Sequence, residues 1–71
     1  MERSIIVKFE IFDVVRLLKD FDDEGVLTGE VATIVEVYTL PREGYELEFV
    51  GEGGITKALF AVGPDDIELC I

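Results

Sequence analysis

The feature that most constrains this chain is a run of β-branched and aromatic residues at positions 29–38, Gly-Glu-Val-Ala-Thr-Ile-Val-Glu-Val-Tyr. Valine, isoleucine, threonine and tyrosine suit a pleated, half-buried surface, and the leading glycine marks a turn. The run therefore predicts a central β-strand. Both of its faces carry apolar residues, so the buried face is weakly specified. We expect Val31, Val35 and Val37 to point inward, with Ile34 buried through a bulge or under the amino-terminal segment.

Four further segments carry the signature of short strands separated by turns. They are residues 12–19, 45–50, 55–62 and 67–71, with turns at 39–44, 51–54 and 63–66. Apolar and acidic residues alternate along 45–50, which predicts that Glu46 and Glu48 face water. Short strands at this spacing favour an antiparallel barrel or sandwich. For so few residues, an all-β fold with a small SH3-like five-stranded antiparallel barrel is the economical solution, because closure removes exposed edges.

The amino-terminal segment, residues 1–11, is expected to be an additional strand or arm ahead of the barrel domain at residues 12–71. Residues 7–11 alternate apolar and charged side chains with a strand period. An exposed strand edge offers unpaired N–H and C=O groups, so the segment Ser4–Phe9 would allow pairing with a second copy and a homodimer. The charges within the segment argue against a signal peptide or a membrane span.

The charge balance limits the kinds of partner that this chain can bind. Sixteen acidic residues stand against six basic ones, for a net charge of −10 in 71 residues. Such a surface repels nucleic-acid phosphates and anionic membranes, whose binding depends on lysine and arginine. It would attract a basic partner. We therefore expect a protein partner of unknown identity, and no nucleic-acid or membrane partner.

The residue types needed for most site chemistry are missing. The sequence has no histidine and one cysteine, Cys70, so an internal disulfide cannot form and a zinc site is not expected. Nucleophilic catalysis lacks a histidine base, and the glycine-rich segment 51–54 lacks the lysine and helix of a phosphate-binding loop. We expect no catalytic residues, no cofactor and no metal, and a cytoplasmic location.

Seven acidic residues are the candidate partner-binding residues. Three are glutamates on predicted strands, and Glu36 is expected to lie across from the Glu46 and Glu48 face on the neighbouring strand. The other four lie in the loop between the first two strands of the barrel: Asp20, Asp22, Asp23 and Glu24. Carboxylates that face one another across strands repel, so these groups should be well solvated and suited to a basic partner rather than to acid–base catalysis.

Two alternatives to a protein-interaction module remain open. The spacing Asp20, Asp22, Glu24 followed by Gly25 resembles the start of an EF-hand loop, and a cation- or ligand-binding domain would use this loop. The resemblance fails at position 12 of that loop, where Val31 replaces the bidentate glutamate. The second alternative is an acidic mimic of nucleic acid, in which carboxylates occupy a basic site on another protein.

Motifs in order along most of the chain resemble a known family of small bacterial proteins, DUF4926. The resemblance rests on Asp13-Val-Val, Leu17, Gly25, Gly29, residues 31–38, Tyr45-Glu-Leu-Glu-Phe49, Gly54, Thr56, Ala58-Leu59 and Asp66-Ile-Glu-Leu69. It covers about Phe12 to Leu69. It implies a small SH3-like β-barrel of unknown function, with no catalytic residues to carry over. It also implies an accessory or neutralising role for a neighbouring gene product.

Overall fold

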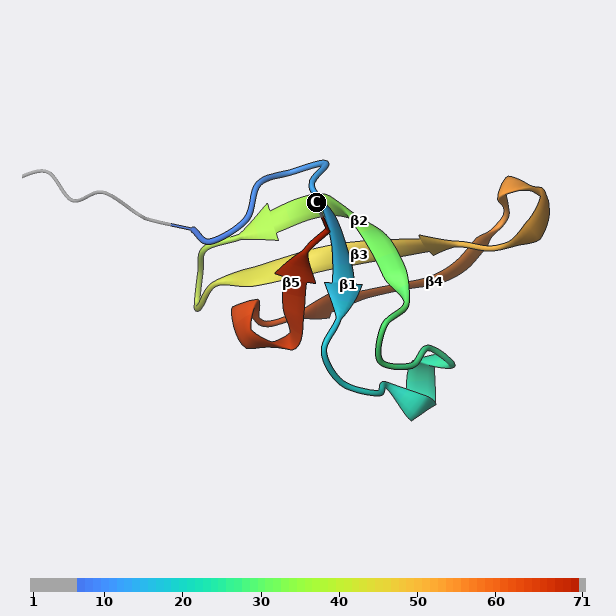
Figure 1. The fold of residues 1–71 in the computed structure, drawn as a ribbon. Coiled ribbons are helices and arrows are strands. Elements are labelled where there is room, and N and C mark those ends of the chain that lie inside the picture. Colours follow the sequence, from blue (N-terminus) through green and yellow to red (C-terminus); the bar gives the residue numbers. More distant parts are fainter. Residues whose placement is uncertain (1–6, 71) are drawn as a thin grey trace, which may run out of the picture.

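The computed structural model describes residues 7–70 as one antiparallel sheet of five strands with three single-turn 3-10 helices. The elements are β1 (Val14–Leu17), η1 (Asp22–Glu24), β2 (Val31–Tyr38), β3 (Gly44–Val50), η2 (Glu52–Gly54), β4 (Thr56–Val62), η3 (Pro64–Asp66) and β5 (Ile67–Leu69). The strand order is β4-β3-β2-β1-β5 (Figure 1). The predicted five-stranded all-β fold is confirmed. No helix within residues 7–70 is long and apolar enough to cross a membrane.

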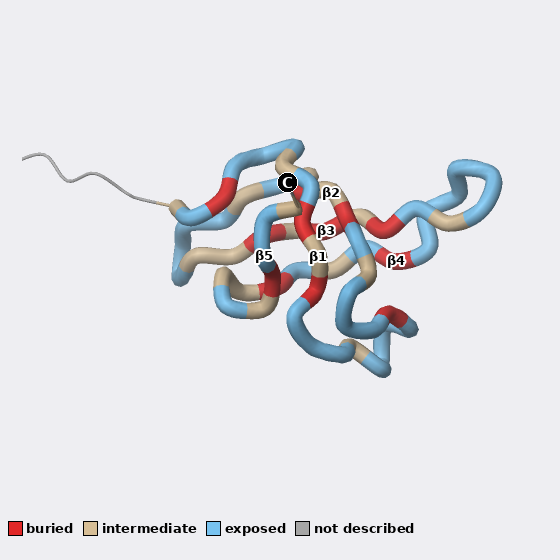
Figure 2. The backbone as a smooth tube through the Cα atoms, in the orientation of Figure 1, coloured by how far each residue is buried: buried red, intermediate tan, exposed pale blue. Residues whose placement is uncertain are grey.

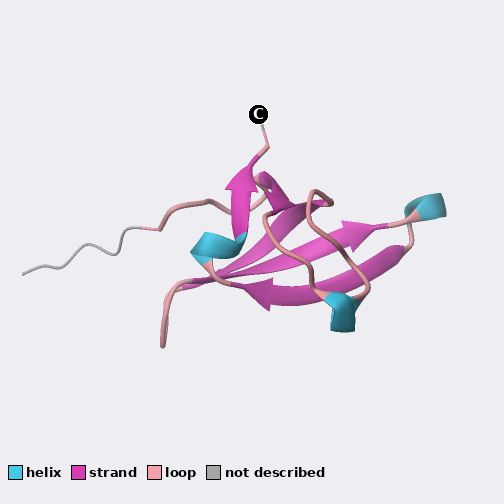
Figure 3. Cartoon of the chain, turned by 60° about the horizontal axis from the view of Figure 1, so that its bottom comes forward, coloured by secondary structure: helices cyan, strands magenta, loops and turns pink. Residues whose placement is uncertain are grey.

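The sheet is strongly curled but open. The short strands β1 and β5 cross β3 and β4 on one side, which brings the two ends of the sheet toward each other (Figures 1 and 3). No ladder joins the edge strands β4 and β5 in the described part of the chain, so the predicted barrel is not closed. Within residues 7–70, the enclosed core contains twelve buried apolar residues: Phe9, Val15, Leu17, Val26, Ala32, Ile34, Tyr45, Leu47, Phe49, Ala58, Val62 and Ile67 (Figure 2).

A bulge in β2 decides which side chains of the central strand are buried. The pairing with β3 shifts between Ile34 and Glu36, so one extra residue stands in β2 at this point. Ile34 is fully buried, as the bulge hypothesis required, and Val37 packs against the core. The inward placement of Val31 was wrong, because alternation from Ile34 puts Val31 on the outer side, where it is 48% exposed. Val35 is only half-buried at the bulge.

Residues 7–11 form no strand, contrary to the prediction for this part of the amino-terminal segment. They cross one end of the curled sheet as an irregular segment, and Phe9 enters the core with 5% exposure. The Phe9 ring meets the Tyr45 ring edge-on at a centroid distance of 5.3 Å, a favourable aromatic geometry. The predicted pairing of Ser4–Phe9 with a second copy falls partly outside the described residues, and the homodimer stays a prediction.

The hydroxyl of Tyr45 fixes this segment to β3. It accepts hydrogen bonds from the backbone N–H groups of Lys8 (2.9 Å) and Phe9 (3.1 Å) and donates to the carboxylate of Glu43. Burial, followed by the Glu43 hydrogen bond, raises the pKa of Tyr45, while the Tyr45 hydroxyl and the Lys8 N–H lower the pKa of Glu43. The buried hydroxyl is thus fully partnered, which removes the desolvation penalty that an isolated one would carry.

Candidate functional site

Three glutamates gather on the outer side of the sheet, and we call Glu36, Glu46 and Glu48 the acidic face. Glu36 on β2 lies directly opposite Glu46 on β3, and Glu48 follows two residues later on the same side of β3. The core-facing neighbours of Glu46 and Glu48 on β3 are fully or almost fully buried, so strand alternation turns both carboxylates outward. The predicted cross-strand arrangement of these three residues is therefore confirmed.

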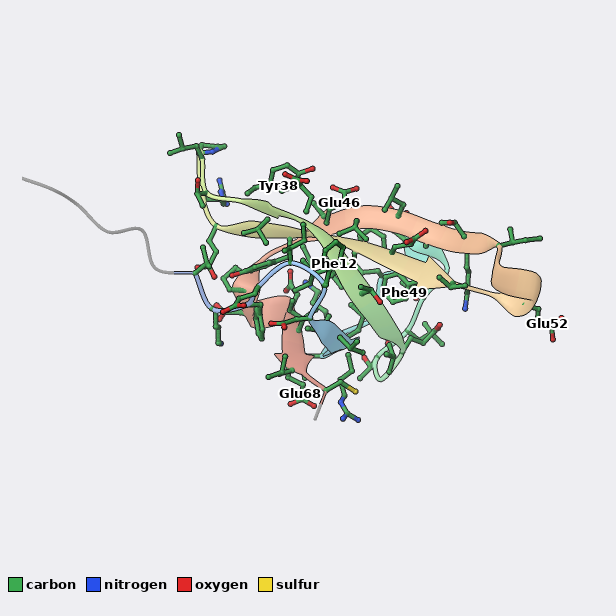
Figure 4. The ribbon with its side chains drawn as sticks, turned by 90° about the horizontal axis from the view of Figure 1, so that it is seen from above. Phe12, Tyr38, Glu46, Phe49, Glu52 and Glu68 are labelled. Atoms are coloured by element: carbon green, nitrogen blue, oxygen red, sulfur yellow. The ribbon has the colours of Figure 1, made fainter. Side chains whose placement is uncertain are left out.

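Neighbouring hydroxyl groups orient two of these carboxylates. The Tyr38 hydroxyl donates to Glu46 Oε1 at 3.0 Å, and the Thr56 hydroxyl donates to Glu48 Oε2 at 2.7 Å. The hydrogen bond to Glu46, followed by burial and by the charges of Glu46 and Glu36, raises the pKa of Tyr38. Each carboxylate has two oxygens and about four acceptor positions, so one hydroxyl bond leaves most of its capacity for a partner. Figure 4 shows Tyr38 and Glu46 side by side.

Three cations of the described chain are paired with carboxylates outside the acidic face. The three ion pairs within residues 7–70 join Arg16 to Glu68, Lys19 to Asp66 and Lys57 to Glu30, at 3.2, 3.9 and 2.8 Å. The Lys57 contact and the Leu27 N–H lower the pKa of Glu30. None of these pairs includes a carboxylate of the acidic face. The Glu36–Glu46 juxtaposition consequently carries like-charge repulsion that an external cation would relieve.

Exposed apolar side chains border the acidic face. Leu59 on β4 is the cross-strand partner of Glu48, and Val14 on β1 is the partner of Thr33, which in turn faces Glu48. Leu59 is 55% exposed and Val14 is 43% exposed. A surface that alternates charge with apolar area in this way resembles protein interfaces, where a water-excluding apolar part adds affinity and polar groups add specificity.

Phe12 is held beside this surface in a strained conformation. Its φ is +73°, in the left-handed region that bulky residues rarely adopt, and its ring is 71% exposed. The Phe12 N–H donates to the carbonyl of Ile34 at 2.6 Å, and the Ile34 N–H donates to the carbonyl of Asp13 at 2.9 Å. These bonds fix the turn against β2, two residues before Glu36. Strain of this kind costs about 1–3 kcal/mol and is concentrated at functional sites.

The other four candidate acids form a separate group, which we call the acidic loop (residues 20–24). Phe21 and Val26 exchange backbone hydrogen bonds at 2.8 and 3.3 Å, and between them the chain makes the single turn of η1. Val26 is fully buried, and the Phe21 ring lies 5.1 Å from the ring of Phe60. These two anchors attach the loop, teal in Figure 1, to the core side of the sheet. Glu46 points to the opposite, outer side.

The geometry of the acidic loop does not favour a cation site. Asp20 Oδ1 accepts both the N–H and the hydroxyl of Thr28 at 2.8 Å, and these bonds lower the pKa of Asp20. The carboxylate that would take the first EF-hand position is thus used to close the loop. Among residues 7–70, no three acidic or cysteine side chains lie close enough together to hold a metal ion.

The chain matches a family model over most of its length. A model described as "Domain of unknown function (DUF4926)" matches residues 11–69. The chain belongs to this family. The match spans all five strands, the acidic face and the acidic loop, which confirms the resemblance predicted from the sequence motifs. Comparisons with curated proteins and with solved structures give no match.

Sequence reasoning did not find several residues that shape the acidic face. Phe12 was taken as part of a strand, and nothing in the residue type announces a left-handed turn, since phenylalanine is disfavoured there. Tyr38 is 41% exposed, and its sequence position does not reveal that its hydroxyl bonds to Glu46. The hydroxyl of Thr56 lies next to Glu48 through a register that only strand pairing reveals. The alternation of side chains along residues 55–62 could have identified Leu59 as a surface residue.

Proposed function

We propose that this chain is a non-enzymatic protein-interaction module, and that its acidic face binds a basic segment of another protein. The observation that carries the proposal is the placement of Glu36, Glu46 and Glu48 on two hydrogen-bonded strands, with no cation of the described chain paired to them. Covering a basic surface of the partner would give the accessory or neutralising role expected for a neighbouring gene product.

The energetics favour a cationic partner. Lysine or arginine from a partner replaces the repulsion between Glu36 and Glu46 by attraction, and Tyr38 and Thr56 already hold the carboxylates in place. Less side-chain freedom is then lost on binding. The exposed Phe12 ring supports the same partner chemistry, because arginine and lysine also bind over aromatic faces. Binding of this kind weakens as salt concentration rises.

The test compares two variants that each remove three negative charges. E36Q/E46Q/E48Q neutralises the acidic face, and glutamine keeps an oxygen for the Tyr38 and Thr56 hydroxyls. D22N/D23N/E24Q neutralises the acidic loop and leaves Asp20 bonded to Thr28. Partners captured from the native cell by the unmodified chain are identified by mass spectrometry, purified and titrated against all three proteins, after circular dichroism confirms that each is folded.

We expect the acidic-face variant to bind about tenfold more weakly at low salt, and the acidic-loop variant to bind within about twofold of the unmodified chain. Exposed charge pairs contribute about 0.2–1 kcal/mol each, so three together account for a change of this size. Equal losses in the two variants would refute the acidic face as the binding surface and leave only a general effect of charge. Displacement of the chain from its partner by DNA would favour nucleic-acid mimicry.

A further inference from the structure

An open groove lies at one end of the acidic face. It runs between the turn that joins β2 to β3 and the η3 turn that joins β4 to β5, and its volume is about 530 Å³. The apolar part of its lining is formed by Tyr38, Leu40, Pro41, Ala61 and Val62. This volume falls within the range of about 300–1,000 Å³ typical of sites for small ligands, so the groove has room for one or two side chains of a peptide.

The groove is continuous with the acidic face. Tyr38 lines the groove and donates its hydroxyl to Glu46, and Ala61 lines it and is the cross-strand partner of Glu46. Glu46 therefore stands at the rim, with Glu36 directly beyond it on β2. A ligand that fills the apolar part of the groove would have its neighbouring residues over these two carboxylates.

Leu40 leaves apolar surface uncovered at the groove. Its side chain is 79% exposed, the highest value among the large apolar residues described. Both acidic lining residues are already engaged: Glu43 accepts from Tyr45 and Lys8, and Asp66 accepts the N–H of Gly63. Arg42 also lines the groove and belongs to none of the ion pairs within residues 7–70. Its five N–H donors suit the carbonyl oxygens of an extended peptide.

We infer that this groove takes an apolar side chain of the partner segment, placed within about two positions of a lysine or arginine that lies on Glu46 and Glu36. This inference rests on the function proposed above and adds the sequence chemistry of the partner: an apolar anchor next to a basic residue. A second copy of this chain is a poor occupant, because its net charge of −10 would be brought against the acidic face.

The test selects peptides from a random heptapeptide display library against the unmodified chain and two serine variants. Leu40→Ser removes the apolar side chain at the groove. Ile55→Ser is the matched control, because Ile55 is also an exposed aliphatic residue, at 71%, but lies in the β3–β4 connection near Glu52, at the opposite end of the hairpin (Figure 4). Both side chains are largely in water, so neither substitution should destabilise the fold.

We expect the unmodified chain and the Ile55→Ser variant to enrich peptides in which an apolar residue lies within two positions of lysine or arginine. Representative peptides should bind Leu40→Ser at least tenfold more weakly. Replacing the apolar residue of the peptide by serine should weaken binding to the unmodified chain and cause little further loss with Leu40→Ser.

Four outcomes would overturn the inference. Peptides enriched in basic residues alone, and bound equally by Leu40→Ser, would reject the groove while leaving the acidic face as a binding surface. Apolar peptides without basic residues, unaffected by Glu46→Gln, would reject the proposed function and, with it, the basic residue of the inferred partner segment. A library that yields no enriched peptide would reject a peptide occupant. If sedimentation shows that the unmodified chain self-associates and that only Leu40→Ser lowers its mass, the occupant is a second copy of the chain.

Discussion

The acidic face and the acidic loop contain the same chemical groups on two different supports. Glu36, Glu46 and Glu48 stand on paired strands whose opposite sides are core, so their positions follow from the sheet itself. Residues 20–24 are held instead by two apolar anchors and by Asp20, whose carboxylate accepts two hydrogen bonds from Thr28. A carboxylate that closes its own loop has less left to offer a partner. The number of acidic residues in a segment therefore does not show how many of its carboxylates are free of bonds within the chain.

The largest expected effect on stability comes from the buried residue beneath the acidic face, compared with an exposed residue beside that face. Leu47 lies between Glu46 and Glu48 on β3 and is fully buried. Leu47→Ala should lower the free energy of unfolding by about 2–5 kcal/mol, and a core of this size supplies only about 3–5 kcal/mol, so the variant should be largely unfolded. Denaturant titration followed by circular dichroism measures this. Leu59→Ala, on the outer side, should stay within about 0.5 kcal/mol of the unmodified chain.

A smaller effect should detach the acidic loop alone. Val26→Ala removes two buried methyl groups beneath the loop and should cost about 2 kcal/mol. Hydrogen exchange should accelerate at the amides of Phe21 and Val26 more than in β3. The exposed neighbour Leu27 provides the control, and Leu27→Ala should leave both rates nearly unchanged. Equal acceleration in β3 would mean that the loop and the sheet open together.

A third comparison concerns the electrostatic repulsion between carboxylates. Glu46→Gln removes the charge that faces Glu36 and should stabilise the fold by about 0.3 kcal/mol at low salt, with the gain vanishing as salt rises. Asp23→Asn should give a smaller gain, since Asp23 has no cross-strand partner in the described chain. Thermal unfolding at two salt concentrations distinguishes the two. A greater gain from Asp23→Asn would place the main repulsion in the loop.

The smallest effect is a local pH dependence. The pKa of Asp20 in the folded chain lies below its ordinary value of 3.8, because Thr28 donates two hydrogen bonds to the ionised carboxylate. Its contribution to stability is therefore complete above about pH 4 and is lost as the pH falls through the lowered pKa. The Thr28 amide resonance, followed by NMR, should titrate in this acid range. In Asp20→Asn that titration should be absent, and its persistence would point to another carboxylate.

The sequence predicted the structure correctly where the residue pattern is compatible with only one arrangement of buried and exposed side chains. In β3, apolar and acidic residues alternate without exception from Tyr45 to Phe49, so the buried and exposed sides followed directly. The turn at 63–66 was likewise predicted and forms η3. The predicted Glu36–Glu46 juxtaposition followed from adding the neighbouring strand to this pattern.

Each misplaced residue has an identifiable physical cause. In β2 both sides are apolar, and the bulge after Ile34 exchanges the sides part-way along, so Val31 was placed inward and lies outward. In residues 7–11 the alternation is present, but the pairing of Phe9 with the buried Tyr45 ring and hydroxyl outweighs it. The left-handed turn at Phe12 runs against its own residue preference. Each of these depends on contacts between segments far apart in the sequence.

The contact between Phe9 and Tyr45 has a practical consequence for anyone who trims this chain. The family match begins at residue 11, and a recombinant fragment cut to residues 11–69 would keep all five strands. It would nevertheless lose a core phenylalanine, whose removal costs about 3–5 kcal/mol, which is about what the whole core of so small a domain supplies. The smallest unit worth producing therefore starts upstream of Lys8, so that Phe9 and its contacts with Tyr45 are kept.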